Sequence, residues 1–192
     1  MVKKKKYLLY ISIALIIGVI LIIFNEIYPV AFVGLKPVFA KDFNRNYSAS
    51  MVYYEKALKT YAKDSQTLEA NEIKKEIQRA VLDNLIENIL IERELKKELK
   101  PSDLNSLVEK KMGEIPGSQT TDKAVETLYG FSFDEFKKRV LEPQAKKEIL
   151  SNRLFLASVD FDERMKSVRS QANIMIFLPG LEWDGKEIIL RD

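Results

Sequence analysis

The fold of this chain is decided by residues 73–99, which read IKKEIQRAVLDNLIENILIERELKKEL. The apolar residues recur at steps of four, and neighbouring leucines and isoleucines widen the stripe that they form: Ile73, Ile77, Val81, Leu82, Leu85, Ile86, Ile89 and Leu90. This period is typical of an amphipathic helix. We therefore predict a long helix from about Thr67 to Leu99, which Pro101 ends.

The segment before this helix changes its period. Val30–Val33 reads as a short strand, residues 34–37 as a turn, and Val38–Phe39 as a second extended segment. From Asp42 the apolar residues follow a helical period, at Phe43, Tyr47, Met51, Tyr54, Leu58 and Tyr61. We predict a first helix that runs from there to about Ala62.

Shorter elements are predicted after Pro101. Ser102 is suited to cap the next helix, and residues 113–118 read as a loop. A helix from about Asp122 to Tyr129 should end at Gly130, a residue that tolerates the left-handed conformation of a helix cap.

The C-terminal part combines one more helix with a hairpin. Residues 132–135, SFDE, fit a capping box, and Pro143 should kink the helix that follows near Arg139. Asn173–Leu178 and Glu187–Leu190 read as a hairpin with a long turn. Because an isolated hairpin is marginally stable, we expect a further strand or helix to cover it.

The N-terminus carries the pattern of a membrane anchor. Only Ser12 and Gly18 in Tyr7–Phe24 lie outside the apolar and aromatic residue types. As a helix, this run would reach about 27 Å, close to the hydrocarbon thickness of a bilayer. The lysines of residues 3–6 favour a cytoplasmic N-terminus, so everything after Asn25 should lie outside the cytoplasm.

A cleaved signal peptide is the alternative to an anchor, because its basic and apolar regions would look similar. Residues 25–29 offer no pair of small residues where a peptidase would cut, and the nearest acceptable triplet, at residues 38–40, lies far downstream. We therefore predict an anchor with its lysine cluster in residues 1–28. Residues 29–192 should form one extracytoplasmic helical domain with a C-terminal β-hairpin.

Composition excludes most catalytic chemistry. The chain has no histidine and no cysteine, so we predict no catalytic, cofactor or metal site. Residues 1–28 hold four lysines and Glu26, which leaves 27 basic and 27 acidic residues of the chain's 31 and 28. With no basic surplus in the domain we expect no nucleic-acid partner. Glu92, Glu94 and Glu98 alternate with basic residues, which is typical of a solvated helix face.

Three motifs carry a family resemblance. They read VLDNLIENILI at residues 81–91, PSDL at 101–104 and YGFSFDEFK at 129–137. With the order of elements, these motifs resemble the N-terminal chaperone domain of the SurA, PpiD and PrsA group of extracytoplasmic foldases, over about residues 29–157. The resemblance implies a mainly helical fold whose N-terminal strand pairs with a C-terminal segment in a small antiparallel sheet. It also implies binding of unfolded or newly translocated polypeptides.

The chain departs from this family in one important respect. Family members usually continue into parvulin-type prolyl isomerase domains, whereas only 35 residues follow Ala157 here and the histidines of parvulin sites are absent. The first strand also differs, since residues 33–38 read VGLKPV where the family usually has VNGxxI. The resemblance therefore implies a chaperone domain without its isomerase, and isomerase activity would require a site without histidine.

Aromatic and methionine side chains of the first helix are the candidate peptide contacts. They are Tyr47, Met51, Tyr53, Tyr54 and Tyr61. The pattern favours the core face of the helix. The alternative is a groove for unfolded chains, which Met and Tyr suit because they adapt to varied partners. Tyr53 and Tyr54 are adjacent and cannot both face one core, so at least one should be exposed. We expect a membrane-anchored, non-catalytic chaperone-like protein, and the alternative is a structural subunit that docks to another membrane or secretion protein.

Overall fold

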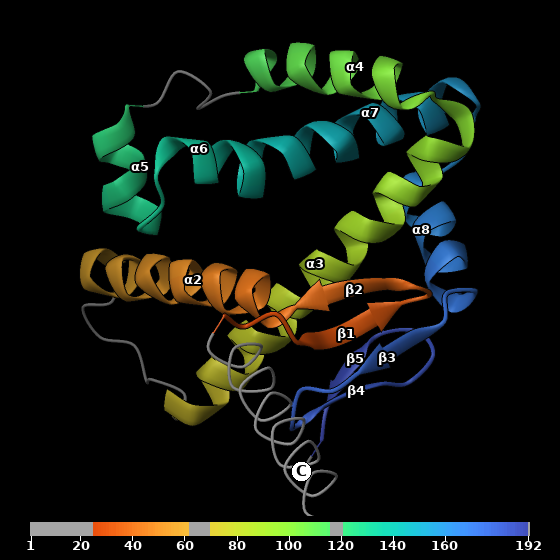
Figure 1. Ribbon diagram of the computed structural model, residues 1–192. Helices are drawn as coiled ribbons and strands as arrows, with labels where there is room; N and C mark the ends of the chain where they lie inside the picture. The colour runs from red at the N-terminus through yellow and green to blue at the C-terminus, as the bar shows by residue number, and fades with distance from the viewer. Residues whose placement is uncertain (1–24, 62–69, 116–120, 192) are drawn as a thin grey trace, which may run out of the picture.

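The computed structural model describes residues 25–61, 70–115 and 121–191. The fold is mainly helical, with a small antiparallel sheet that joins N-terminal and C-terminal strands, as predicted (Figure 1). The helices are α2 (Ala40–Tyr61), α3 (Ala70–Glu98), α4 (Pro101–Glu114), α5 (Asp122–Tyr129), α6 (Phe133–Phe136), the π-helical segment η1 (Lys137–Leu141), α7 (Glu142–Leu156) and α8 (Phe161–Ser170). The strands are β1 (Pro29–Val33), β2 (Lys36–Phe39), β3 (Ile174–Ile176), β4 (Leu181–Trp183) and β5 (Ile188–Leu190).

Four predictions fall partly or wholly on residues that the structure does not describe. The predicted anchor at Tyr7–Phe24 is one of them. Among the helices that are described, none has both the length and the apolar character that a bilayer crossing requires. The others are the end of the first helix at Ala62, the start of the long helix at residues 67–69 and residues 116–118 of the predicted loop. Helix α2 is described up to Tyr61 and α3 from Ala70 onward.

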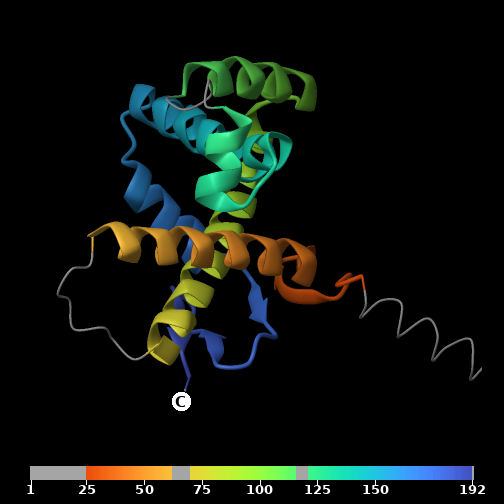
Figure 2. The ribbon, with the colours of Figure 1, turned by 90° about the vertical axis from the view of Figure 1, so that its left-hand side faces the viewer.

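Helix α3 is the central element of the domain. It packs against α2, which crosses it, and against α7 and β5 (Figure 2). Five of its large side chains are almost fully excluded from solvent: Leu82, Ile86, Leu90, Ile91 and Leu95. The predicted helix is confirmed, but Ile77, Leu85 and Ile89 of the predicted stripe are only half-buried. Several elements cover α3, so the helix buries more than one row of residues. The row with Leu82, Ile86 and Leu90 is more buried than the row with Ile77, Leu85 and Ile89, which recurs at steps of four in the sequence.

The N-terminal hairpin and the C-terminal tail form one antiparallel sheet, with strand order β2-β1-β3. Phe32 in β1 lies opposite Pro37 in β2 and Met175 in β3. The predicted pairing between the ends of the domain is therefore confirmed. The predicted turn at residues 34–37 is shorter than expected, because Gly34, at φ 61°, allows a two-residue loop and Lys36 and Pro37 join β2.

The predicted hairpin between residues 173–178 and 187–190 is wrong. Strand β3 pairs with β1, and β5 pairs with β4, a strand that lies within the predicted long turn. The turn between β4 and β5 is compact because Asp184 Oδ1 accepts the N–H groups of Lys186 and Glu187, at 2.7 and 2.8 Å. Gly185, at φ 99°, supplies the left-handed residue that this turn needs. The C-terminal tail therefore contributes strands to two separate sheets: β3 to the sheet with β1 and β2, and β4 and β5 to the second sheet.

Most of the predicted helix ends agree with the structure. The Thr121 hydroxyl caps α5, and Gly130 ends that helix at φ 66°. The Ser132–Glu135 capping box is present at the start of α6. Pro143 coincides with a local change of helix type, because the segment before it, η1, is π-helical. Since Pro143 has no N–H to donate to the Arg139 carbonyl, this irregularity has the expected cause.

Two details of α4 contradict the sequence prediction. Ser102 does not cap the helix; Lys100 occupies that position without a side-chain hydrogen bond, and Pro101 lies in the first turn. Proline favours the first helical position, which places Ser102 inside the helix, where its hydroxyl donates to Asp103 at 3.1 Å. The predicted loop starts later, because Gly113 and Glu114 belong to α4.

Of the three glutamates predicted to lie on a solvated face of α3, Glu98 is exposed, but Glu92 and Glu94 are not. Glu94 is only 5% exposed and accepts hydrogen bonds from Lys97 and from Arg164 of α8, the latter at 2.6 Å. Glu92 binds Lys146 of α7 at 3.1 Å and Lys96 at 2.5 Å. Burial raises the pKa of the Glu92 carboxyl, but these hydrogen bonds outweigh it and the pKa falls to about 2. These carboxylates therefore connect α3 to α7 and α8.

Candidate functional site

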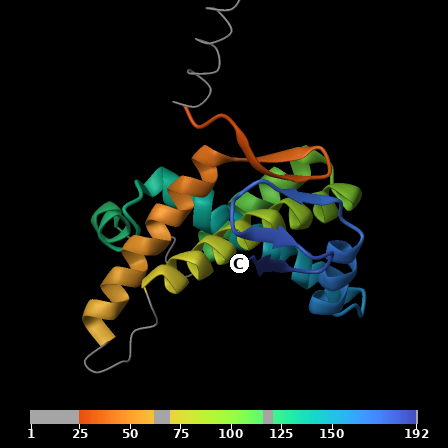
Figure 3. The same ribbon diagram turned by 90° about the horizontal axis from the view of Figure 1, so that it is seen from below.

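An open groove of about 550 Å³ lies between α2, α3 and α7. Its lining comes from four parts of the chain: Asn46, Ala49, Ser50 and Tyr53 of α2; Ile77, Ala80, Val81, Asn84, Glu87 and Asn88 of α3; Tyr129 and Phe131 at the end of α5; and Arg139, Val140, Pro143, Gln144 and Lys147 of η1 and α7. The groove exists because α2 crosses α3 while α7 packs on a different part of α3 (Figures 2 and 3).

Aromatic rings form one end of the groove. Tyr53 of α2 stacks on Tyr129 of α5, with ring centroids 5.7 Å apart and planes 7° apart. Tyr129 packs in turn against Phe131 and Phe136, at 6.3 and 5.5 Å. Phe131 and Phe136 are buried and hold Tyr129 in place, whereas Tyr53 is 51% exposed. The ring of Tyr53 is therefore a rigidly supported apolar surface that is open to a ligand.

Four side-chain amides contribute polar groups to the groove, between apolar residues such as Ile77, Val81 and Val140. Asn84 and Asn88 lie one turn apart on α3, and the Asn88 amide donates to Asn84 Oδ1 at 3.0 Å. Asn46 of α2 and Gln144 of α7 line the same groove. A side-chain amide carries the same donor and acceptor groups as a peptide backbone. The groove can therefore hydrogen-bond an extended polypeptide without reading its sequence.

Glu87 is the acidic residue of the groove, and it already has partners. Its carboxylate accepts hydrogen bonds from Lys147 of α7 and Arg169 of α8, both at 2.9 Å. Arg169 also holds both carboxylate oxygens of Asp83, at 2.7 and 3.0 Å. These ion pairs join three helices beneath the groove, so Glu87 acts here as a structural connection.

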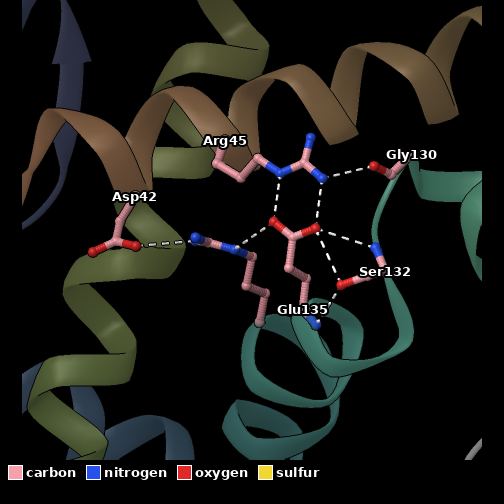
Figure 4. A network of polar contacts seen from close by, with 6 residues as sticks. Asp42, Arg45, Gly130, Ser132 and Glu135 are labelled. Atoms are coloured by element: carbon pink, nitrogen blue, oxygen red, sulfur yellow. Dashed lines mark hydrogen bonds and ion pairs between the residues drawn. The ribbon is translucent and has the colours of Figure 1, made fainter. Parts of the chain in front are cut away.

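A polar network beside the groove fixes α2 against the start of α6 (Figure 4). Arg45 holds Glu135 with two bonds, at 2.7 and 2.6 Å, and also donates to the Gly130 carbonyl at 2.7 Å. Glu135 accepts the Ser132 N–H at 3.1 Å, so one carboxylate closes the capping box and binds α2. The hydrogen bond from Arg45 lowers the pKa of Glu135 to about 2. Asp42 binds Arg139 of η1 at 3.1 Å and extends the same connection.

The structure separates the five predicted peptide-contacting residues. Tyr53 lines the groove. Tyr47 packs against the core, with its ring stacked on Phe43 at 6.2 Å. Met51 and Tyr54 are half-buried and do not line the groove, and Tyr61 is the last residue of α2, with a side chain outside the described part of the structure.

Sequence reasoning missed most of the groove. Its residues on α2 are at positions 46, 49, 50 and 53, a helical face that is mostly small or polar and gives no hydrophobic signal. Tyr129 falls within a motif of the sequence analysis, but nothing in the sequence places it against Tyr53. The Asn84 and Asn88 pair on one helix face is a sequence signal that could have been used.

Comparison with protein-family models, with curated proteins and with solved structures found no match. The family resemblance seen in the sequence motifs therefore stays a prediction. Within residues 25–61, 70–115 and 121–191, no cluster of acidic side chains is arranged to hold a metal ion.

Proposed function

We propose that this protein is a single-pass, membrane-anchored binding module outside the cytoplasm, which holds unfolded or newly translocated polypeptides without covalent chemistry. The observation that supports the proposal most is the open groove between α2, α3 and α7, with the exposed ring of Tyr53 at one end. Its volume, about 550 Å³, lies within the range of about 300–1,000 Å³ that is usual for ligand sites.

The chemistry of the groove suits a ligand of variable sequence. The rings of Tyr53 and Tyr129 offer an apolar surface to a side chain of the bound polypeptide. The amides of Asn46, Asn84 and Gln144 offer hydrogen bonds to its backbone. Apolar contact and backbone contact are the two interactions that any unfolded chain can make, so a site built from them would be promiscuous.

Photocrosslinking in intact cells tests this proposal. A photoreactive amino acid at Tyr53 should give a ladder of crosslinked species, because many clients would pass through the groove. The control position is Leu107 on α4, which is also partly exposed but does not line the groove. Ladders of equal strength from both positions would contradict the groove as the binding site.

Purified protein provides the second test. The full chain in detergent should slow the aggregation of an unfolded test protein, Tyr53→Ala should weaken this effect, and Leu107→Ala should retain it. The protein should not accelerate cis/trans exchange in a prolyl peptide. Isomerase turnover, or full protection by the Tyr53→Ala variant, would contradict the proposal.

A docking subunit is the second candidate, and one observation favours it. Phe155 and Leu156, at the end of α7, are largely exposed, with Val159 close by in the turn to α8. Exposed apolar residues that lie together are typical of a contact with another protein. A single discrete crosslinked band from Phe155, without a ladder from Tyr53, would support this function instead.

A further inference from the structure

The three-stranded sheet has one face against the helices and one face that is exposed and apolar. The inner face is buried: Ala31, Val33, Val38 and Ile174. The outer positions alternate with these residues and hold no polar side chain: Phe32, Pro37, Phe39, Met175 and Phe177. Met175 is 47% exposed and Phe177 55%. An antiparallel sheet with one face in water normally carries polar residues there, so this outer face departs from the usual pattern.

This apolar face begins where the N-terminal segment joins the domain. Phe39 pairs with Pro29, the first residue of β1, and the Phe177 N–H donates to the Val30 carbonyl at 2.8 Å. Phe177 also meets Phe32 edge to face, with ring centroids 6.0 Å apart. The outer rings therefore extend from the first residues of β1 along the sheet.

The connector between the apolar run and β1 is short. Residues 25–28 alone separate Phe24 from Pro29. Even a fully extended chain would cover no more than about 18 Å between these two residues. Ile27 and Tyr28 in the connector are themselves exposed apolar residues, so the apolar surface continues toward the N-terminal segment.

Hydrogen bonds fix this connector to the domain. The Lys41 N–H donates to the Glu26 carbonyl at 3.1 Å, and the Ala40 N–H donates to the Tyr28 carbonyl at 2.9 Å. The Asn44 side chain donates to Glu26 Oε1 at 3.0 Å. The connector is therefore part of the folded domain and not a free linker. Whatever surface holds residues 7–24 must lie close to the first residues of the sheet.

We infer that the outer face of the β2-β1-β3 sheet rests on the lipid surface of the membrane that holds the anchor. The headgroup region of a bilayer is broad and fluid, so the rings of Phe32, Phe39 and Phe177 could reach the acyl chains beneath it without a partner of matching shape. Aromatic side chains are favourable at the boundary between headgroups and acyl chains. The inference rests on the proposed anchoring of Tyr7–Phe24, but not on polypeptide binding in the groove.

Spin labelling of the full chain in vesicles tests the inference. Because the chain has no cysteine, Met175→Cys creates a single labelling site on the outer face. Leu107→Cys, partly exposed on α4, is the matched control. In vesicles of phosphatidylcholine and phosphatidylglycerol, oxygen concentrates in the bilayer and a nickel chelate stays in water. The ratio of collisions with oxygen to collisions with the chelate should be several-fold higher at position 175 than at position 107.

A second variant tests whether the lipid contact depends on the apolar face. Phe177→Glu, combined with the label at position 175, should lower the collision ratio toward the control value and leave the far-UV circular dichroism unchanged. An unchanged ratio in this folded variant would overturn the inference.

Three other outcomes would overturn the inference, and each has a distinct meaning. The collision ratios at positions 175 and 107 could be equal in protein that resists alkaline extraction from the vesicles. This result would show that the sheet face lies in water although the protein is anchored in the membrane. Few collisions with either reagent at position 175 would show that protein covers the face, either residues 1–24 or a second copy. Extraction of the protein from the vesicles at alkaline pH would contradict the proposed anchor at Tyr7–Phe24, on which the inference rests. Crosslinking from Tyr53 tests polypeptide binding separately.

Discussion

Strand β5 allows a sharp test of whether the C-terminal tail belongs to the same cooperative unit as the helices. Ile188 and Ile189 are neighbours with identical side chains, but Ile188 is 2% exposed and Ile189 is 39% exposed. Strand β5 packs against α3, and Ile188 pairs with Trp183 of β4. Ile188→Ala should therefore destabilise the whole domain, and Ile189→Ala is its matched control.

The magnitude follows from the atoms removed. Ile188→Ala deletes three buried carbon atoms, which at about 0.8 kcal/mol each gives about 2.4 kcal/mol for transfer alone. The cavity left behind adds to this, and partial burial of the side chain in the unfolded state reduces it, so the free energy of unfolding should fall by about 2–5 kcal/mol. Ile189→Ala should change it by less than about 1 kcal/mol. In a domain of this size the melting temperature falls by about 2–4 °C per kcal/mol, so Ile188→Ala should melt about 4–20 °C lower.

Two probes distinguish a cooperative tail from an independent one. Trp183 is the single tryptophan of the chain, so its fluorescence reports on the β4-β5 hairpin, and far-UV circular dichroism reports on the helices. In urea, both transitions of Ile188→Ala should move together to a lower midpoint. If the fluorescence transition moves while the helical transition stays in place, the tail is an independent appendage and the reasoning is refuted.

Three further predictions concern single contacts. The pKa of Glu135 is about 2, against an ordinary 4.5. The stability that this carboxylate contributes is therefore present above pH 4.5 and is lost as the pH falls toward about 2. Over this interval the urea midpoint of the Glu135→Gln variant should fall less than that of the unmodified chain. Gly130→Ala should lower the free energy of unfolding by about 1–2 kcal/mol, because Gly130 has a φ of 66°. Gly113→Ala, within α4, should instead raise the free energy of unfolding by about 0.5–1 kcal/mol. Equal shifts of the melting temperature in the two variants would contradict this difference. Arg169→Met should cost about 2–3 kcal/mol in urea denaturation, because Asp83 loses both hydrogen bonds from Arg169 and Glu87 keeps only the one from Lys147. A loss no larger than that of Arg153→Met, in an exposed pair worth less than about 1 kcal/mol, would count against it.

The sequence alone was sufficient where a structural decision is local. The helical period of residues 73–99 predicted α3, because a helix that buries one face has apolar side chains three and four positions apart. Gly130 and Ser132 marked a helix cap and a capping box correctly, and the kink predicted from Pro143 falls where the structure has a π-helical segment. Each of these acts on backbone groups within four residues of itself, so the signal and its target lie in the same short stretch of sequence.

Local reasoning failed where two local signals compete or where a partner is distant. Ser102 has the right chemistry for a cap, but Pro101 takes the first helical position and shifts the helix start. The charge pattern around Glu94 is that of a surface, yet Arg164, 70 residues away, makes burial possible by supplying a charged partner. The mispaired hairpin has the same origin, because β3 pairs with the distant β1 rather than with its neighbour in sequence.

The candidate site shows this division most clearly. The sequence determined that α2 carries aromatic residues and that Tyr53 and Tyr54 must face different ways. Only the tertiary structure decided that Tyr53 stacks on Tyr129 at one end of the groove while Tyr47 packs against the core. The physical reason is that a helix specifies the relative directions of its own side chains through its period, whereas the surface that each direction meets depends on how separate helices cross and pack.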